Sequence, residues 1–129
     1  MNRPISTTKA PASFSKYSQA VEIQAGSRIV HVSGQVGVLP DGTLPDDERA
    51  QHEQTWRNIL AILDAAGLGA HDIVDVTGYL TGPAGVPIYR EVRDAMLDGA
   101  QPASTVLIVS GLADPRWKVE ISVVAAASD

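Results

Sequence analysis

Cysteine is absent from this chain of 129 residues. Without a thiol, the chain can form neither a disulfide nor a thiolate nucleophile, and it cannot build a cysteine-ligated zinc or iron–sulfur centre. Long apolar runs are missing as well, because no segment approaches the roughly 20 apolar residues that span a bilayer. The first residues also lack the apolar segment of a signal peptide. We therefore expect a cytoplasmic protein with no membrane partner.

Positive charge is scarce and dispersed. The chain has 10 Lys and Arg residues against 15 Asp and Glu, which gives a formal net charge of −5, and no two basic residues are adjacent. Nucleic-acid binding requires a cluster of cations that follows the phosphate backbone. We therefore expect no nucleic-acid partner.

Metal and cofactor motifs are also missing. His31, His52 and His71 do not have the spacing of a zinc pair. Gly34-x-x-Gly37 is not followed by a predicted helix, as a dinucleotide-binding loop would be. The acidic run at residues 46–48 is interpreted as the start of a helix. We expect neither a metal nor an organic cofactor.

The composition that is present is typical of a globular protein. The hydrophobic fraction is 44% and the charged fraction is 19%, both ordinary for a folded chain. The length favours one domain, residues 1–129. Residues 1 to about 16 mix Pro, Ser, Thr and Lys, which predicts an arm that docks on the rest of the chain.

Apolar spacing predicts two helices. Asp46 or Asp47 can cap the first helix, and Gly67 ends it. Its buried stripe follows the i, i+3, i+4, i+7 pattern of Trp56, Ile59, Leu60 and Leu63. The second helix covers about residues 86–97, stops at Gly99, and directs inward Val86, Tyr89, Val92 and Met96.

Alternating and β-branched residues predict strands over about residues 20–24, 28–36, 73–81, 104–109 and 119–126. The resulting order is ββαβαββ, which indicates an α+β fold with one mixed sheet and both helices on a single face. The other face would expose Val and Ile side chains from several strands. A patch of that kind predicts a partner, and cyclic homo-oligomerisation is the simplest way to cover it.

Glu120 lies in the most strand-like stretch of the chain. Side chains alternate across a strand, so Lys118, Glu120 and Ser122 share one face while Val119 and Ile121 share the other. A carboxylate in such a strand either faces solvent on a one-sided sheet or occupies a functional cleft. The periodicity alone leaves both interpretations open.

Several segments in this order resemble the reactive intermediate deaminase (Rid) family, also called the YjgF family. The similarity extends from about Ala10 to Ala126 with no large insertion. It is carried by the following segments: Tyr17-Ser18-Gln19-Ala20-Val21, Val32-Ser33-Gly34-Gln35-Val36, Asn58-Ile59-Leu60, Ala65-Ala66-Gly67, Asp72-Ile73-Val74-Asp75-Val76-Thr77, Pro102-Ala103-Ser104-Thr105-Val106 and Val119-Glu120-Ile121.

The resemblance implies a chorismate-mutase-like fold assembled as a homotrimer, with the sheets as an inner barrel and small-molecule clefts between subunits. Deaminating members hydrolyse the C=N bond of a 2-imino acid to ammonia and a 2-keto acid. By the same resemblance Glu120 orients the water, while Tyr17 and the Ser33-Gly34-Gln35 turn line the cleft. Arg90 lies near the position where many members carry an asparagine at the cleft rim.

One family feature is missing. Members of the family grip the substrate carboxylate with an arginine in a Pro-x-Arg-Ser segment, and alignment backwards from Ser104 and Thr105 puts Ala103 at that position. By the same resemblance Ala103, Ser104 and Thr105 are candidate substrate-binding residues. Loss of a charge-assisted contact of this kind removes roughly 1.5–3 kcal/mol of binding free energy. The absence therefore argues against short 2-imino acids as substrates. Trp117, beside the Glu120 strand, is a further candidate for the cleft or for packing.

Other cations are possible replacements for that arginine. For Arg90 and Arg93 the ordinary interpretation is a solvated helix face, and for Arg116 it is a turn over residues 113–116. Lys118 would as readily neutralise Glu120 as bind a substrate.

Three functions stay open on the sequence. The first is a Rid-type hydrolase of a small enamine or imine, in which Glu120 positions water. The second is a trimer that binds or senses a small molecule without catalysis. The third is the endoribonuclease role attached to some family members, which the acidic charge of the chain makes the least favoured.

Overall fold

The computed structural model describes residues 2–128. Its elements follow one another in this order: β1 (Arg3–Ile5), β2 (Ala20–Glu22), β3 (Arg28–Val36), α1 (Glu48–Ala65), the 3₁₀ turn η1 (Ala70–Asp72), β4 (Ile73–Leu80), α2 (Gly85–Met96), β5 (Ala103–Ile108) and β6 (Val119–Ala127). From residue 20 onward this order confirms the ββαβαββ prediction. The arm adds one short strand, β1.

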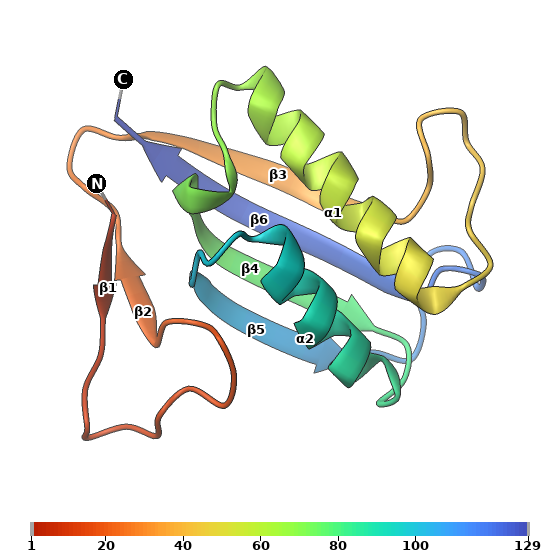
Figure 1. Cartoon of the computed structure of the whole chain (residues 1–129), viewed down its shortest axis with the longest axis horizontal. Coiled ribbons are helices and arrows are strands. Elements are labelled where there is room, and N and C mark those ends of the chain that lie inside the picture. Colours follow the sequence, from red (N-terminus) through yellow and green to blue (C-terminus); the bar gives the residue numbers. More distant parts are fainter. Residues whose placement is uncertain (1, 129) are drawn as a thin grey trace.

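The main sheet has four strands in the order β3-β6-β4-β5. β4 and β5 run parallel, whereas β6 is antiparallel to both β3 and β4, so the sheet is mixed. Both helices cover one face of this sheet (Figure 1). The α+β fold class is therefore confirmed. The strand at residue 20 lies outside the main sheet, because β2 pairs with β1 in a separate two-stranded sheet.

Helix α1 begins where the sequence predicts. The Asp47 side chain accepts a hydrogen bond from the Ala50 backbone N–H, with an N···O distance of 3.0 Å. Such a cap satisfies one of the unpaired N–H groups of the first turn. Gly67 has a φ of 77°, and this left-handed conformation favours glycine just past a helix end.

The core lies between the helices and the sheet. Trp56, Ile59 and Leu63 of α1 are fully buried, as the predicted stripe requires, whereas Leu60 is half-buried. They belong to the same cluster as the inward residues of β6: Val119, Ile121, Val123 and Ala125. Close approach of α2 depends on Gly78 of β4, since a Cβ there would lie 2.4 Å from the ring of Tyr89.

Arg93 of α2 corrects the interpretation of a solvated helix face. The residue is only 2% exposed. Its guanidinium donates to the Ser15 hydroxyl at 2.8 Å, pairs with Asp94, and lies 5.7 Å from the centroid of the Tyr89 ring. Ser15 in the arm and Asp94 on α2 supply the hydrogen-bond acceptors that this buried cation needs.

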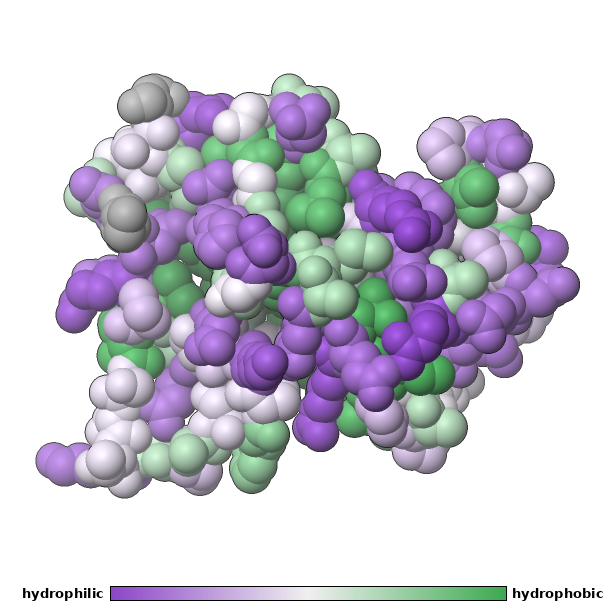
Figure 2. All heavy atoms as spheres, viewed as in Figure 1, coloured by the Kyte–Doolittle hydropathy of each residue, from purple (hydrophilic) through white to green (hydrophobic). Residues whose placement is uncertain are grey.

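The two faces of the molecule differ. On the helix-covered face, hydrophilic and hydrophobic residues are interspersed (Figure 2). The opposite sheet face exposes large apolar side chains at its edges, among them Ile29 (53% exposed) on β3 and Leu107 (46%) on β5. Neither helix of the described chain is both long and apolar enough to cross a bilayer.

Candidate functional site

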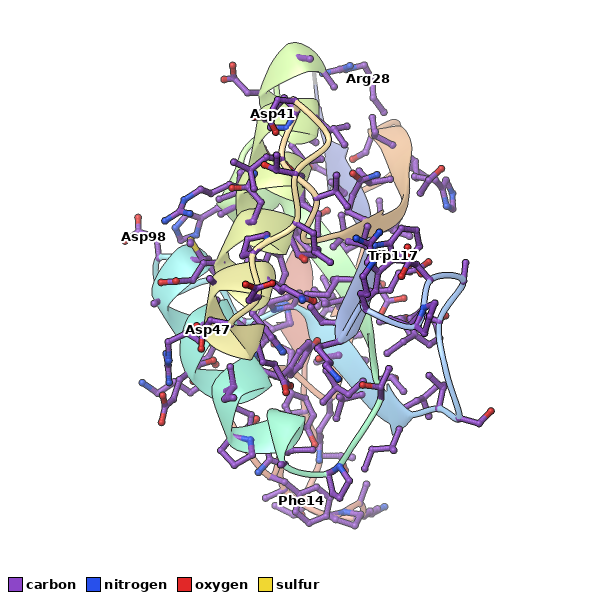
Figure 3. The ribbon with its side chains drawn as sticks, turned by 90° about the vertical axis from the view of Figure 1, so that its right-hand side faces the viewer. Phe14, Arg28, Asp41, Asp47, Asp98 and Trp117 are labelled. Carbon is purple, nitrogen blue, oxygen red and sulfur yellow. The ribbon has the colours of Figure 1, made fainter. Side chains whose placement is uncertain are left out.

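Glu120 lies on the sheet face that the helices leave open. Its neighbours Val119 and Ile121 are fully buried beneath the helices. Alternation along β6 therefore turns Glu120 and Ser122 to the other face, where both are half-buried. Figure 3 shows the helices on one side of the sheet and Trp117 near the start of β6.

A hollow of about 300 Å³ surrounds the Glu120 side chain. It is lined by Gly34, Tyr79, Val109, Gly111, Leu112, Glu120 and Ser122. The strand register explains this grouping, because Glu120 is paired with Val36 of β3 on one side and with Tyr79 of β4 on the other. The segment between β5 and β6 supplies the remaining wall. This volume suits a small molecule.

Gly34 leaves the space that the Glu120 carboxylate occupies. The register of β3 against β6 shifts between Val32 and Gln35, so Gly34 lies within an irregularity of the strand. A Cβ on Gly34 would lie 2.1 Å from Oε2 of Glu120. The carboxylate therefore lies directly over the Gly34 backbone, and only glycine leaves room for it.

The polar groups of the hollow have no partners within the described chain. The Glu120 carboxylate and the hydroxyls of Tyr79 and Ser122 take part in no hydrogen bond or ion pair with residues 2–128. No Lys, Arg or His is among the residues that line the hollow. Glu120 is thus its one formal charge, and it is available to accept a hydrogen bond from water or from a ligand.

The other predicted residues on β3 and near β6 lie around this hollow without lining it. Ser33 is exposed beside Gly34. Gln35 is paired with the buried Ile121, so its side chain turns to the helix-covered side. Trp117 is half-buried in the segment that leads into β6.

The predicted residues on β5 and in the arm form a second group. Ala103 is paired with Asp75 of β4 and bridged to Ser18, next to Tyr17 in the arm. Tyr17 uses its hydroxyl to accept a hydrogen bond from the Phe14 backbone N–H at 3.2 Å. On β4, Asp75 is paired with Ala103, and Tyr79, four residues later, is paired with Glu120. At about 3.3 Å per residue, this second group therefore lies roughly 13 Å from Glu120 along the sheet.

Three further candidates lie in different surroundings. Thr105 is exposed and is paired with Thr77 on the open face. Ser104 interacts instead with Tyr89 on the helix-covered side, where burial raises the pKa of the Tyr89 phenol and Ser104 opposes that rise. Arg90 is half-buried on α2. Within one chain, therefore, Gly34 is the predicted binding residue that joins Glu120 in the hollow.

The cations near β6 do not reach the hollow. Arg116 forms the predicted turn, since its side chain pairs with Asp114 at 2.8 Å. The hydrogen bonds from Arg116 lower the pKa of the Asp114 carboxyl to about 2. Lys118 is exposed, and it makes no ion pair with Glu120 among the described residues.

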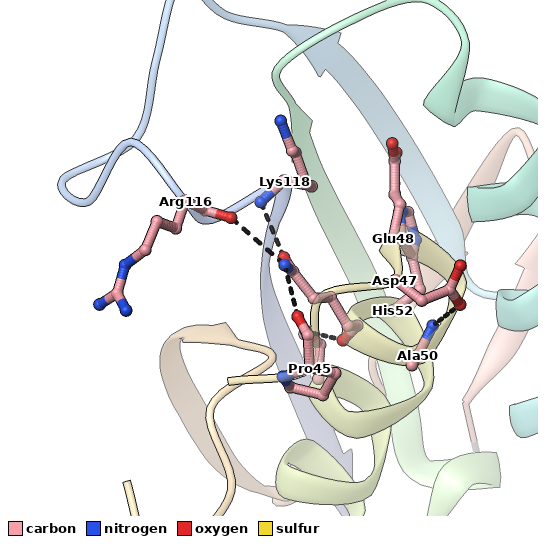
Figure 4. Close-up of polar contacts among 9 residues, drawn as sticks. Pro45, Asp47, Glu48, Ala50, His52, Arg116 and Lys118 are labelled. Atoms are coloured by element: carbon pink, nitrogen blue, oxygen red, sulfur yellow. Dashed lines mark hydrogen bonds and ion pairs between the residues drawn. The ribbon is translucent and has the colours of Figure 1, made fainter. Parts of the chain in front are cut away.

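A buried glutamine holds the segment that walls the hollow. The Gln51 amide on α1 donates to the carbonyls of Pro45 and Arg116 and accepts from the Lys118 backbone N–H, at 3.0, 3.2 and 2.9 Å (Figure 4). These bonds tie the start of α1 to the end of the β5–β6 segment. Sequence patterns do not reveal this residue, because a polar side chain on a helix is ordinarily solvated.

Tyr79 is the other residue that sequence reasoning missed. The available signal was its place on the polar face of the predicted strand, in step with Asp75 and Thr77. That signal shows which face Tyr79 occupies but not which residue lies opposite. No group of three or more His, Asp or Glu side chains in residues 2–128 is arranged to hold a metal ion.

Comparison with known proteins finds a family model and similar sequences. The family described as Endoribonuclease L-PSP matches residues 7–127. The chain is 34% identical to mouse (Mus musculus) 2-iminobutanoate/2-iminopropanoate deaminase, over 97% of this chain and 91% of that protein.

Solved structures agree with this match. The Rid-family protein YyfB from Yersinia pestis, whose function is unknown, has a TM-score of 0.88 at 30% identity and 98% coverage of both chains. Escherichia coli TdcF with bound serine has a TM-score of 0.74 at 32% identity, over 98% of this chain and 99% of that one.

Proposed function

Because the chain belongs to the Rid/YjgF/L-PSP family, matched over residues 7–127, we propose that it is a deaminase-type hydrolase of a small reactive imine or enamine. The named activity of the mouse relative supports this reaction class. The observation that carries the proposal is the Glu120 carboxylate, which has no partner in the described chain and lies in a small hollow over Gly34.

The chemistry requires one base and one water. Water donates a hydrogen bond to the Glu120 carboxylate, which draws off a proton as the water oxygen attacks the carbon of the C=N bond. The nitrogen takes up protons, the C–N bond of the resulting carbinolamine breaks, and ammonia and a carbonyl compound leave. A positioned carboxylate of this kind contributes roughly 10²- to 10⁴-fold to the rate.

The substrate differs from short 2-imino acids in this proposal. Ala103 stands where the family arginine would grip a carboxylate, and no cation lines the hollow around Glu120. A bidentate guanidinium has no equivalent in alanine. Imines and enamines with no carboxylate, or with a larger apolar body, need no such contact.

The assembly in this proposal is a homotrimer with the ligand cleft between subunits. The exposed apolar residues of the open sheet face, such as Ile29 and Leu107, support burial of that face. In this proposal, the cleft between copies brings residues 17, 103 and 105 of one copy toward Glu120 of another. Such a cleft would explain why the residues around Glu120 and those around Ala103 lie apart within one chain.

Ammonia release from imines generated in the assay tests the proposal. Wild-type protein is compared with Glu120→Gln, and Glu53→Gln on α1 serves as the matched control. We expect a loss of about 100-fold or more in kcat/KM for Glu120→Gln and no change for Glu53→Gln.

Two results would contradict the proposal. Turnover that survives Glu120→Gln would exclude the assigned base. Saturable binding of a small ligand without turnover of any imine would instead indicate a binding or sensing role. RNA cleavage is not expected, because the hollow carries a negative charge and no basic residue.

A further inference from the structure

The hollow contains two hydroxyl groups beside Glu120 that no assigned role uses. Tyr79 is the residue directly opposite Glu120 in the β4–β6 pair, and Ser122 follows two residues later on the same face. Residues paired in this way have Cβ atoms about 4.5–5.5 Å apart. Both side chains line the hollow, and neither hydroxyl has a hydrogen-bond partner in residues 2–128.

The rest of the lining defines the chemistry that the hollow accepts. Val109 and Leu112 are apolar, Gly34 and Gly111 offer only backbone, and Glu120 is the one charged residue. A single negative charge with no cation among the lining residues of the described chain attracts a positive ligand and repels a carboxylate. Partly desolvated surroundings strengthen both effects.

We infer that Tyr79 is a substrate-binding residue and that, with Ser122 and Glu120, it selects a protonated imine that bears no carboxylate. This inference rests on the proposed function of Glu120. The Tyr79 oxygen accepts an N–H of the iminium ion, Ser122 offers a second hydrogen bond, and Val109 and Leu112 contact the apolar substituent.

The balanced reaction follows from this assignment. The iminium ion R–CH=NH₂⁺ and water give R–CHO and NH₄⁺: a C–O bond forms, the C–N bond breaks, and the protons of the water pass through Glu120 to the leaving nitrogen. Loss of two electrons and a proton from a primary amine generates such an imine. The supplying reaction is therefore an amine oxidation.

The test compares two imines made in the assay. An added amine oxidase converts propylamine to propan-1-imine, and an added amino-acid oxidase converts alanine to 2-iminopropanoate. The activity of the protein is the initial rate of ammonia release above the rate measured without the protein. We expect kcat/KM for propan-1-imine to exceed that for 2-iminopropanoate by at least about tenfold, the factor that corresponds to 1.4 kcal/mol.

Tyr79→Phe tests the residue itself. The loss of one hydrogen bond is expected to lower kcat/KM for propan-1-imine about three- to tenfold, mainly through KM. Tyr89→Phe makes the same chemical change on the other side of the sheet, against Gly78, and is expected to leave the kinetics unchanged. Leu112→Arg adds a cation to the wall of the hollow and should shift the preference toward 2-iminopropanoate.

The outcomes separate the inference from the proposed function. Preference for 2-iminopropanoate, or a Tyr79→Phe variant that behaves as wild type while Glu120→Gln abolishes turnover, overturns the inference and leaves the proposed function standing. Absence of turnover of both imines by wild-type protein overturns both.

Discussion

At the scale of single residues, the site depends on the small volume of Gly34. The Glu120 carboxylate fills the space that any larger side chain at position 34 would need. Among the described residues, the glycines with a left-handed φ are Gly26, Gly42, Gly67 and Gly99. Gly34 is not one of them. Glycine is therefore required at position 34 because a side chain would collide with Glu120, and not because of the backbone conformation.

Gly34→Ala is expected to displace the carboxylate and lower kcat/KM at least about tenfold. Stability should change by less than about 1 kcal/mol, because Gly34 is exposed on the open face and an exposed substitution seldom costs more. Imine hydrolysis and chemical denaturation of the same preparation measure the two effects. Gly82→Ala is the control, since a Cβ there meets no atom within 4 Å. Full activity of Gly34→Ala would contradict the steric argument.

At the scale of elements, α1 does more than cover the sheet. Its stripe of Trp56, Ile59 and Leu63 fills the core, while one turn nearer its start Gln51 reaches the chain just before β6. The same helix thus supports the fold and holds one wall of the hollow. The arm has a comparable link, because Ser15 bonds to the buried Arg93 of α2.

Gln51→Leu is expected to lower the free energy of unfolding by about 2–3 kcal/mol, because three hydrogen bonds are lost and their partners stay unpaired. Activity should fall as well, since the segment before β6 loses its anchor. Gln54→Leu on the same helix removes a side-chain bond to Asn58 only, and it should cost less than about 1 kcal/mol. Denaturant titration measures the free energy of unfolding of both variants. Equal losses of that free energy would exclude an anchoring role for Gln51.

The elements themselves were largely predictable from the sequence. Asp47, the 3.6-residue spacing of α1 and Gly67 define a helix by local chemistry, and the structure confirms it. Arg93 was misjudged because its guanidinium bonds to Ser15, 78 residues away, and no local pattern records that contact. The short β1 was missed for a similar reason, since its three residues form a strand only by pairing with β2.

At the scale of the whole molecule, the open sheet face carries exposed apolar side chains. Its apolar edges and the hollow lie on the same side of the sheet, so burial of this face would enclose the site. Association and catalysis are therefore expected to depend on one surface.

Leu107→Lys is expected to weaken the proposed homotrimer, because three unpaired charges would be buried at its interface. Light scattering should give about three times the 13.6 kDa chain mass for wild-type protein and a value near one chain for the variant. Ile62→Lys on α1, an exposed apolar residue of the helical side, is the control. A wild-type protein of single-chain mass would rule out the trimer.

The sequence by itself determined the order of elements, the buried helical stripe, the carboxylate at position 120 and the absence of an arginine at position 103. Each of these follows from residue identity or from spacing within one element. The tertiary structure alone decided that Gly34, Tyr79 and Ser122 surround Glu120, and that Gln51 anchors the wall beside them. The physical reason is strand pairing: alternation gives the face of a side chain, whereas its neighbours across the sheet are set by contacts between distant segments.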